Sequence, residues 1–301
     1  MNYYNEIKNK LIDNEVYKRV KDYSKNRNDL NTYYEVGKLL IEAQGGKERA
    51  KYGDRLIKEY SERLFNDIGR KYNITTLKRI RQFYLVVEKG APLAHQLTWS
   101  HYCELLPLKD INEINYYIQM TIEQCLSKRQ LRERIKTKEY QRLDDNTKLK
   151  LINNEELEIT DNVKNPIVIY NKNNLDKNNI SEKVLKNLIL EDLDNFLKEL
   201  GSGFCYIENE YKIKIGGTYN YIDLLLFNIK FNCCVVVELK VCELKKEHIG
   251  QIEVYMNYID KNIKTINQDK TIGIIISRRD NHYYIEYSSD KRILTREYIL
   301  T

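Results

Sequence analysis

The stretch YNYIDLLLFNIKFNCCVVVELK, from Tyr219 to Lys240, decides the fold of the second half of this chain. It holds two apolar, β-rich runs, Tyr221–Phe227 and Cys233–Leu239, which are separated by a short polar segment. Two such runs joined by a few turn-forming residues are typical of a β-hairpin. We therefore expect the chain to reverse near Lys230 and to place the two runs side by side.

Three charged residues interrupt the hairpin: Asp223, Glu238 and Lys240. Burying a charge is costly unless it is paired or binds a metal. Side chains alternate along a strand, so Glu238 and Lys240 project to one side, and the expected turn places Asp223 opposite Glu238 with Cβ atoms about 5 Å apart. Two carboxylates this close suit a divalent cation such as Mg²⁺, which binds carboxylates, water and substrate phosphate. An ordinary ion pair at a strand rim is the alternative, but the register favours a metal site, beside which Lys240 would orient or activate a water molecule.

These residues carry a family resemblance. Gly217-x3-Tyr221-Ile222-Asp223 followed by Glu238-Leu239-Lys240 resembles the D…ExK core of the PD-(D/E)XK nuclease superfamily. More closely, GFCYIENEYKIKIGGTYNYIDLLLFN, VVVELK and GQIEVYMNYID resemble the YhcG-type nuclease family. The resemblance implies an α/β/α restriction-endonuclease-like domain with a mixed sheet. It further implies that Asp223, Glu238 and the backbone carbonyl of Leu239 hold Mg²⁺, or Mn²⁺ in its place, while Lys240 activates water.

The same resemblance implies accessory residues on the neighbouring helices. Nucleases of this superfamily often aim one more acid at the metal from the helix before the hairpin, expected here over Ser181–Leu200. Glu182 is our candidate and Glu191 the reserve, although a first-turn acid favoured by the helix dipole explains Glu182 equally well. Gln251 and Tyr255, four residues apart on the following helix, resemble an accessory motif that braces the lysine or contacts substrate.

Length and composition fit a two-domain chain with real cores. The chain has 301 residues, of which 42% are hydrophobic and 31% charged, and this length favours about two domains. No apolar run approaches the roughly 20 residues that span a bilayer, and the N-terminus lacks the apolar region of a signal peptide. The six cysteines form no CxxC pair, which speaks against zinc and fits a reducing compartment. We expect a cytoplasmic protein without membrane contact.

Charge is spread unevenly along the chain. Residues 1–150 carry 30 Lys and Arg against 21 Asp and Glu, whereas the remainder carries 20 against 23. A basic first half favours a polyanionic partner such as DNA. A lysine-rich composition with solvated helix faces explains the excess equally well.

A candidate helix-turn-helix lies in the first half. The segment SERLFNDIG, residues 61–69, leads through a short turn to ITTLKRIRQFY, residues 74–84. In a helix-turn-helix the second helix lies in the major groove, where Lys78, Arg79 and Arg81 would contact phosphates or bases. A basic two-helix hairpin of an ordinary all-α domain is the alternative. A later basic helix, expected over Ser127–Tyr140, would lay Arg132 and Arg134 along the phosphate backbone.

The first half also resembles a family, the helical domain that precedes the YhcG-type nuclease. The matching pieces are KYGDRLIKEYSERL, LKRIRQFY, LTWSHYCELLPLKD and INYYIQMTIEQCLSKRQLRERI. We therefore expect a helical DNA- or partner-binding domain at 1–143, a connecting segment at 144–179 that is rich in Asn, Lys and Asp, and a nuclease domain at 180–301. Its last strands are expected over Thr271–Ser277 and His282–Tyr287.

These observations predict a Mg²⁺-dependent deoxyribonuclease with endonuclease activity. Cutting both strands of a duplex usually needs two sites, so we expect a homodimer. The resemblance implies a role in bacterial genome defence, such as phage defence, or in restriction-like DNA processing, with partner subunits. The alternative is a catalytically silent subunit that binds DNA or another component of a defence complex.

Overall fold

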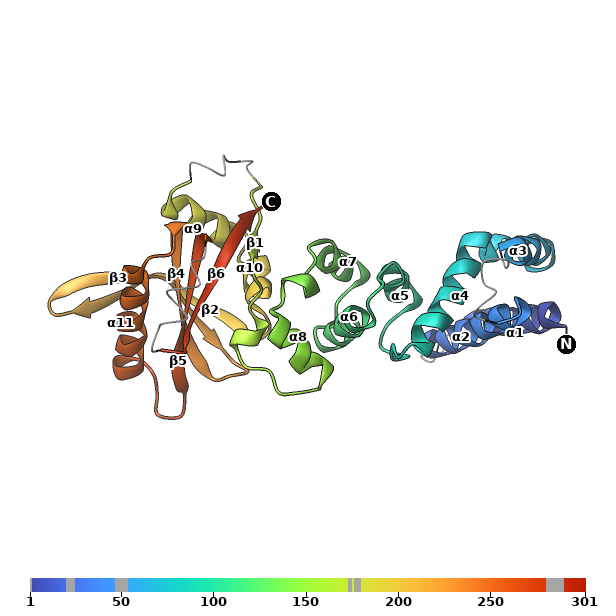
Figure 1. The fold of residues 1–301 in the computed structure, drawn as a ribbon, viewed down its shortest axis with the longest axis horizontal. Coiled ribbons are helices and arrows are strands. Elements are labelled where there is room, and N and C mark those ends of the chain that lie inside the picture. The colour runs from blue at the N-terminus through green and yellow to red at the C-terminus, as the bar shows by residue number, and fades with distance from the viewer. Residues whose placement is uncertain (1, 20–24, 47–53, 173–174, 176–179, 280–289) are drawn as a thin grey trace. The chain divides into compact units, whose positions relative to one another are not determined.

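The computed structural model describes residues 2–19, 25–46, 54–172, 175, 180–279 and 290–301. The chain divides into two compact units, Met1–Tyr140 and Gln141–Thr301. The first is helical, and the second is built on a sheet (Figure 1). The predicted fold class, a helical region followed by a mixed-sheet α/β domain, is confirmed. Among the helices described, none combines the length and apolar content that crossing a bilayer requires.

The α-helices described in the first unit are α1 (Tyr3–Arg19), α2 (Lys25–Ala43), α3 (Asp54–Ile68), α4 (Ile74–Glu88), α5 (Trp99–Leu105), α6 (Ile111–Glu123) and α7 (Lys128–Lys136). The 3-10 turn η2 (Arg70–Tyr72) joins α3 to α4. Helix α4 begins at Ile74 because the Asn73 side chain accepts a hydrogen bond from the Thr76 N–H at 2.9 Å, which satisfies an otherwise unpaired donor of the first turn.

Helices α2 and α4 pack unusually closely. The buried residues of α4 form a stripe at helical spacing: Leu77, Ile80, Phe83, Tyr84 and Val86. Gly37 of α2 lies against this stripe, and a Cβ atom placed on it would come within 2.6 Å of the Ile80 carbonyl oxygen and the Tyr84 Cβ. Only glycine permits so close an approach of two helix backbones.

The second unit contains α8 (Asp145–Ile152), β1 (Ile167–Ile169), α9 (Glu182–Glu191), α10 (Leu193–Leu200), β2 (Phe204–Ile215), β3 (Thr218–Asn228), β4 (Cys233–Glu243), α11 (Lys246–Asn262), β5 (Asp269–Arg279) and β6 (Ile293–Leu300). The strand order is β1-β6-β5-β4-β3-β2. Strands β2, β3 and β4 are antiparallel neighbours, whereas β4, β5, β6 and β1 run parallel. The sheet is therefore mixed.

Each face of the sheet carries its own apolar core. Helices α9 and α10 contribute to one core, together with Leu224 and Val237 among the strand residues. Helix α11 covers the opposite face, where it packs on Leu225 and Val236. Strand β4 is buried along most of its length, as expected of a strand covered on both faces.

The structure differs from the sequence-based expectations in several elements. The helix expected over Ser181–Leu200 is interrupted at Asp192, whose φ of −135° and ψ of 47° separate α9 from α10. Strand β6 was not expected, and the strand expected over His282–Tyr287 lies outside the described residues.

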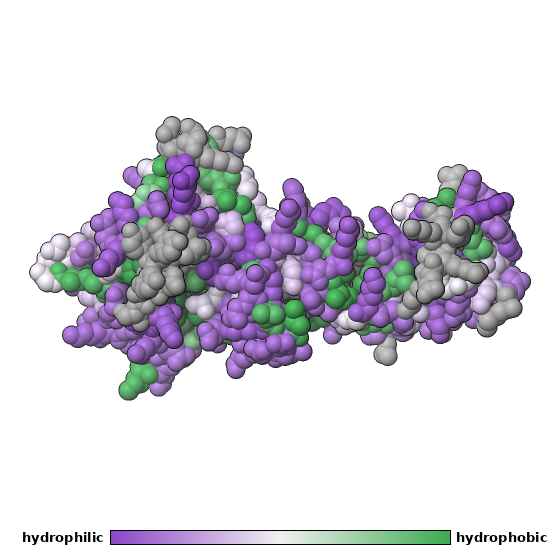
Figure 2. Space-filling view, viewed as in Figure 1, coloured by the Kyte–Doolittle hydropathy of each residue, from purple (hydrophilic) through white to green (hydrophobic). Residues whose placement is uncertain are grey.

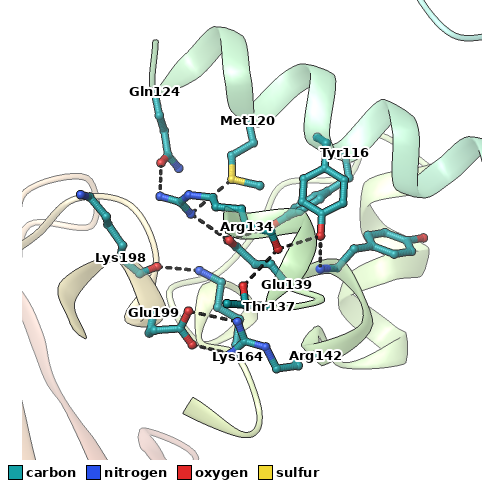
Figure 3. Close-up of polar contacts among 12 residues, drawn as sticks. Tyr116, Met120, Gln124, Arg134, Thr137, Glu139, Arg142, Lys164, Lys198 and Glu199 are labelled. Carbon is teal, nitrogen blue, oxygen red and sulfur yellow. Dashed lines mark hydrogen bonds and ion pairs between the residues drawn. The ribbon is translucent and has the colours of Figure 1, made fainter. Parts of the chain in front are cut away.

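The segment 144–179, expected as a connection, holds α8 and β1, and β1 pairs with β6. Two arginines tie its residues to the sheet domain. The Arg142 guanidinium donates to the Glu199 carboxylate (Figure 3). It also donates to the Pro166 carbonyl at 2.8 Å. Arg296 of β6 donates to the Val163 carbonyl at 3.0 Å. Part of this segment is therefore packed as an integral portion of the sheet domain.

Candidate active site

The hairpin between β3 and β4 places Asp223 beside Glu238. The register predicted from the sequence is confirmed: the ladder runs from Asn228 opposite Cys233 to Leu224 opposite Val237. The two acids follow directly after its last pair, where each carboxylate binds the backbone of the opposite strand. The Leu239 N–H donates to Asp223 Oδ2 at 2.9 Å, and the Asp223 N–H lies 3.4 Å from Glu238 Oε1.

Lys240 completes this carboxylate pair. Its Nζ lies 3.4 Å from Glu238 Oε2 and 3.8 Å from Glu182 Oε2. Burial lowers the pKa of Lys240, but the charges of Glu238, Glu182 and Asp223 outweigh it and leave this pKa raised. The ammonium group is therefore held beside the two acids as a charged hydrogen-bond donor.

Glu238 is the most electrostatically strained group of the site. Its residue is only 2% exposed. Burial, followed by the charge of Asp223, raises the pKa of Glu238 to about 7, against the opposing effect of Lys240. Two neighbouring carboxylates, of which one is buried, resist ionising together. An additional cation at this position would relieve that repulsion.

Helix α9 brings two residues to the site. Ser181 caps the helix by accepting from the Val184 N–H, and Glu182 in its first turn contacts Lys240. Lys186 lies one turn later on the same helical face, with its Nζ 3.4 Å from Asp223 Oδ1 and 2.8 Å from Glu210 Oε1.

Sequence reasoning missed Lys186. Burial lowers the pKa of Lys186, but Glu210 and Asp223 more than compensate, so this pKa is raised. The only signal in the sequence was its i,i+4 spacing from Glu182. Glu191, the reserve acid, lies nine residues from Glu182 at the other end of α9, about 13 Å along the helix axis.

Helix α11 carries Gln251 and Tyr255, whose accessory role stays a prediction. The Gln251 side-chain amide donates to the Tyr255 hydroxyl at 3.0 Å, so the two residues of the accessory motif bind each other. Tyr255 itself is part of the core under α11. His248, two turns before Tyr255, is buried, and its pKa is lowered by burial and then by the charge of Lys240. A neutral imidazole near the lysine is a feature that sequence reasoning did not anticipate.

The proposed DNA-contacting residues of the first unit have different environments. Arg134 has its guanidinium turned inward, where it donates to Glu139 at 2.9 Å and to Gln124 at 2.8 Å (Figure 3). Its side chain is 11% exposed and that of Glu139 is 2% exposed. The Arg134 guanidinium is therefore engaged in a buried ion pair, and its predicted contact with DNA stays a prediction.

The other four basic residues lie nearer the surface. Arg132 is exposed and makes two hydrogen bonds to Glu104 at 2.9 and 2.8 Å. Arg79 is exposed on α4, whereas Lys78 and Arg81 are half-buried, and the Arg81 guanidinium lies 3.4 Å from the Gln44 side-chain oxygen. Helix α4 follows α3 after a short 3-10 turn, as a helix-turn-helix requires.

The donor chemistry of the site fits a hard divalent cation. Asp223 and Glu238 offer carboxylate oxygens, and Leu239 between Glu238 and Lys240 offers a backbone carbonyl. In the described parts of the chain, no three His, Cys, Asp or Glu side chains gather as a metal-holding group. An ion here would therefore take its remaining ligands from water and substrate, which is the usual habit of Mg²⁺. Burial, and then the charge of Asp223, raise the pKa of Glu238, and a cation bound here would favour its ionised form.

A mixed sheet with helices on both faces, and an Asp, Glu and Lys cluster on adjacent strands, define the class of a PD-(D/E)XK nuclease domain. Residues 161–301 match the YhcG PDDEXK nuclease domain, and residues 9–142 match the DUF1016 N-terminal domain. The chain therefore belongs to the YhcG-type PD-(D/E)XK nuclease family that carries this helical N-terminal domain. Nucleases of this class generally use divalent metal ions.

Known relatives and structures are similar to the chain to different degrees. The "Putative nuclease YhcG" of Escherichia coli (strain K12) is 26% identical over 284 residues, which cover 81% of this chain and 75% of the relative. A repair endonuclease from Pyrococcus abyssi is 21% identical with a TM-score of 0.30, and the match covers 40% of this chain and 47% of that one. The EndoMS-dsDNA2 complex is 20% identical with a TM-score of 0.31, over 39% of this chain and 44% of that one. This chain thus spans less than half of either solved structure.

Proposed function

We propose that this chain is a Mg²⁺-dependent endonuclease that hydrolyses DNA phosphodiester bonds, with Mn²⁺ able to replace Mg²⁺. The observation that carries the proposal is the proximity of two carboxylates and a lysine on adjacent strands. Asp223 accepts from the Leu239 N–H at 2.9 Å, and Lys240 Nζ lies 3.4 Å from Glu238. A purely structural strand would gain nothing from burying two like charges together.

The position of each residue determines its role in the proposed reaction. Asp223, Glu238 and the Leu239 carbonyl would hold the ion, and Glu182 is a further candidate ligand through its carboxylate near Lys240. When bound, the ion would polarise a phosphoryl oxygen and lower the pKa of a coordinated water. Lys240 donates hydrogen bonds that orient the attacking water and offset the negative charge developing on the phosphoryl group.

Other residues have supporting roles in this proposal. Gln251 and Tyr255, joined by their hydrogen bond, would stiffen the helix that packs under Lys240 or meet the substrate. In the first unit, Lys78, Arg79, Arg81 and Arg132 would contact DNA phosphates from α4 and α7. A homodimer would supply one site for each strand of a duplex. The setting we propose is bacterial genome defence, including phage defence, or restriction-like processing with partner subunits.

A cleavage assay on plasmid and linear DNA with Mg²⁺ or Mn²⁺ tests the proposal. The full chain is compared with Asp223→Ala and Lys240→Ala, and RNA of the same sequence serves as the alternative substrate. Glu191→Gln on α9 and Lys261→Ala at the end of α11 are the matched controls, because they remove the same charges away from the carboxylate pair. Calorimetric titration of Mn²⁺ into each variant reports ion binding separately from activity.

We expect metal-dependent cutting by the wild type and the controls, at least about 100-fold slower cutting by both site variants, and weaker Mn²⁺ binding in Asp223→Ala. Absence of cutting, combined with DNA binding that neither site mutation alters, would overturn the proposal. That result would favour the silent DNA-binding or interaction subunit, and light scattering of the same samples would test the homodimer.

A further inference from the structure

Beyond Asp223, strands β2 and β3 continue as a two-stranded arm. It projects past α11 at the left of Figure 1. In this arm Lys212 lies opposite Tyr221 and Lys214 lies opposite Tyr219. Gly216 and Gly217 close it with φ values of 55° and 90°. Two consecutive positive φ values are the requirement of a type I′ hairpin turn, so the arm is a regular, well-defined hairpin.

The two faces of the arm differ in chemistry. One face carries Ile213 and Ile222, which are 1% and 0% exposed and join the core under α11. The other face carries Lys212, Lys214, Tyr219 and Tyr221, and we call these four residues the arm face. Residues directly opposite in an antiparallel pair share one side of the sheet. The contacts agree, because Lys212 Nζ lies 3.9 Å and Lys214 Nζ 5.7 Å from the centre of the Tyr219 ring.

The arm face is open to solvent. Tyr219 is 54% exposed and Tyr221 is 53% exposed, and both lysines are exposed. The other face of this strand is buried, but these two large rings are exposed to solvent and have no role in the core. Scattered exposed aromatics need no explanation, but these two are adjacent on one face and are accompanied by two cations.

The arm face leads directly into the carboxylate pair. Tyr221 and Asp223 are two residues apart on β3 and therefore project to the same side. From Tyr219 to Asp223 the strand advances about 13 Å. At the root of the arm, Lys186 forms ion pairs with both Glu210 and Asp223. Its positive charge therefore offsets part of the negative charge of these two acids. The outward part of the arm face thus presents positive charge and aromatic rings.

Lysines combined with exposed aromatic rings suit a particular kind of nucleic acid. Lysines hold the phosphate backbone of any strand, whereas an aromatic ring stacks on a base only where that base is unpaired. We propose that the arm face binds an unpaired stretch of the substrate strand next to the bond that is cut. The preferred substrate would then be DNA with a single-stranded segment, such as a flap or a splayed end, rather than a continuous duplex. This inference rests on the proposed nuclease function and specifies its substrate.

Fluorescence anisotropy of labelled DNA tests the inference. The full chain is titrated, in EDTA to prevent cutting, with a continuous duplex and with the same duplex carrying a single-stranded flap. The variants are Tyr219→Leu/Tyr221→Leu and its conservative partner Tyr219→Phe/Tyr221→Phe, together with Lys212→Gln/Lys214→Gln. Lys261→Gln/Lys270→Gln is the matched charge control, because these exposed lysines lie where α11 ends and β5 begins, away from the arm. Thermal unfolding verifies that each variant is folded.

The outcomes separate the alternatives. We expect the leucine pair to lose about tenfold or more in affinity for the flap, with little change for the duplex, while the phenylalanine pair binds like the wild type. The lysine pair should weaken binding to the flap and reduce the dependence of affinity on salt, and the control pair should do neither. Equal flap binding by the leucine pair and the wild type, or equal losses for flap and duplex, would overturn the inference.

Cleavage assays with Mg²⁺ distinguish this failure from failure of the proposed function. If the wild type cuts DNA and Tyr219→Leu/Tyr221→Leu cuts the flap as well as the wild type does, the inference about the arm face is refuted and the proposed nuclease function is not. A wild-type chain that cuts no DNA, while arm variants still lose flap binding, would refute the nuclease proposal and leave the arm as a binding surface.

Discussion

Asp223 and Glu238 each approach a backbone N–H of the opposite strand at the point where the β3–β4 ladder ends. The Leu239 N–H binds Asp223 and the Asp223 N–H approaches Glu238, so the two carboxylates are fixed before any ligand arrives. Ionising Glu238 beside Asp223 is energetically unfavourable, because burial and the charge of Asp223 raise the pKa of Glu238 to about 7. In our proposal this arrangement serves to bind a cation.

The raised pKa of Glu238 predicts that Glu238→Gln stabilises the fold in a pH-dependent way. The pKa of Glu238 is about 7 in the folded chain and has its ordinary value of 4.5 in the unfolded chain. The folded chain therefore holds the Glu238 proton more tightly, and the protonated carboxyl group contributes its full stabilisation below pH 4.5. The contribution is lost as the pH rises through about 7. In metal-free buffer at pH 8.5 the variant should therefore be more stable than the wild type, by up to about 3 kcal/mol.

Chemical unfolding in EDTA at pH 5 and pH 8.5 measures this difference, which should shrink at pH 5. A variant that is less stable at pH 8.5 would mean that the ion pair of Glu238 with Lys240 outweighs the penalty of burial.

Lys186 allows a second test at the residue scale. Its Nζ lies 3.4 Å from Asp223, so its positive charge competes with any cation that Asp223 binds. Lys186→Met should tighten Mn²⁺ binding by about tenfold, which corresponds to about 1.4 kcal/mol of removed repulsion. Calorimetric titration measures the effect, with Lys183→Met on the same helix as the control. Unchanged or weaker Mn²⁺ binding in Lys186→Met would show that this lysine serves only to tie α9 to the sheet.

At the scale of elements, the contact between α2 and α4 depends on Gly37. A Cβ atom at this position would lie 2.6 Å from both the Ile80 carbonyl oxygen and the Tyr84 Cβ. Gly37→Ala must push the helices apart, and overpacking of this kind costs about 1–3 kcal/mol. Thermal unfolding should show a lower midpoint for this variant than for Gly250→Ala on α11, where an added Cβ meets nothing within 4 Å. Equal midpoints would show that α2 can shift at no cost.

The sequence revealed the elements whose residues follow a regular pattern. The hairpin register followed from two apolar runs and the turn between them, and it brought Asp223 beside Glu238. Strand β2, with the sequence FCYIENEYKIKI, escaped notice because one side is solvated and polar residues occupy much of it. The break at Asp192 also escaped, because the apolar stripe continues across it. Lys186 and the inward turn of Arg134 depend on partners distant in the sequence or on tertiary burial, which periodicity does not encode.

At the scale of the whole molecule, two compact units correspond to two family matches, 9–142 and 161–301. The first unit carries all of the excess positive charge of the sequence, because the second unit is slightly negative. In the view of Figure 2, hydrophilic residues cover much of the surface, with smaller apolar areas between them. In our proposal the first unit supplies attraction to DNA, and the second unit supplies the arm face and the chemistry.

The most direct measurement is the anomalous diffraction of Mn²⁺ in crystals of the full chain. Our account predicts a peak within coordination distance of carboxylate oxygens from both Asp223 and Glu238, and loss of that peak in Asp223→Asn crystals grown and soaked identically. A Mn²⁺ peak bound elsewhere, or one that persists in Asp223→Asn, would contradict the claim that this carboxylate pair is the metal site of the nuclease.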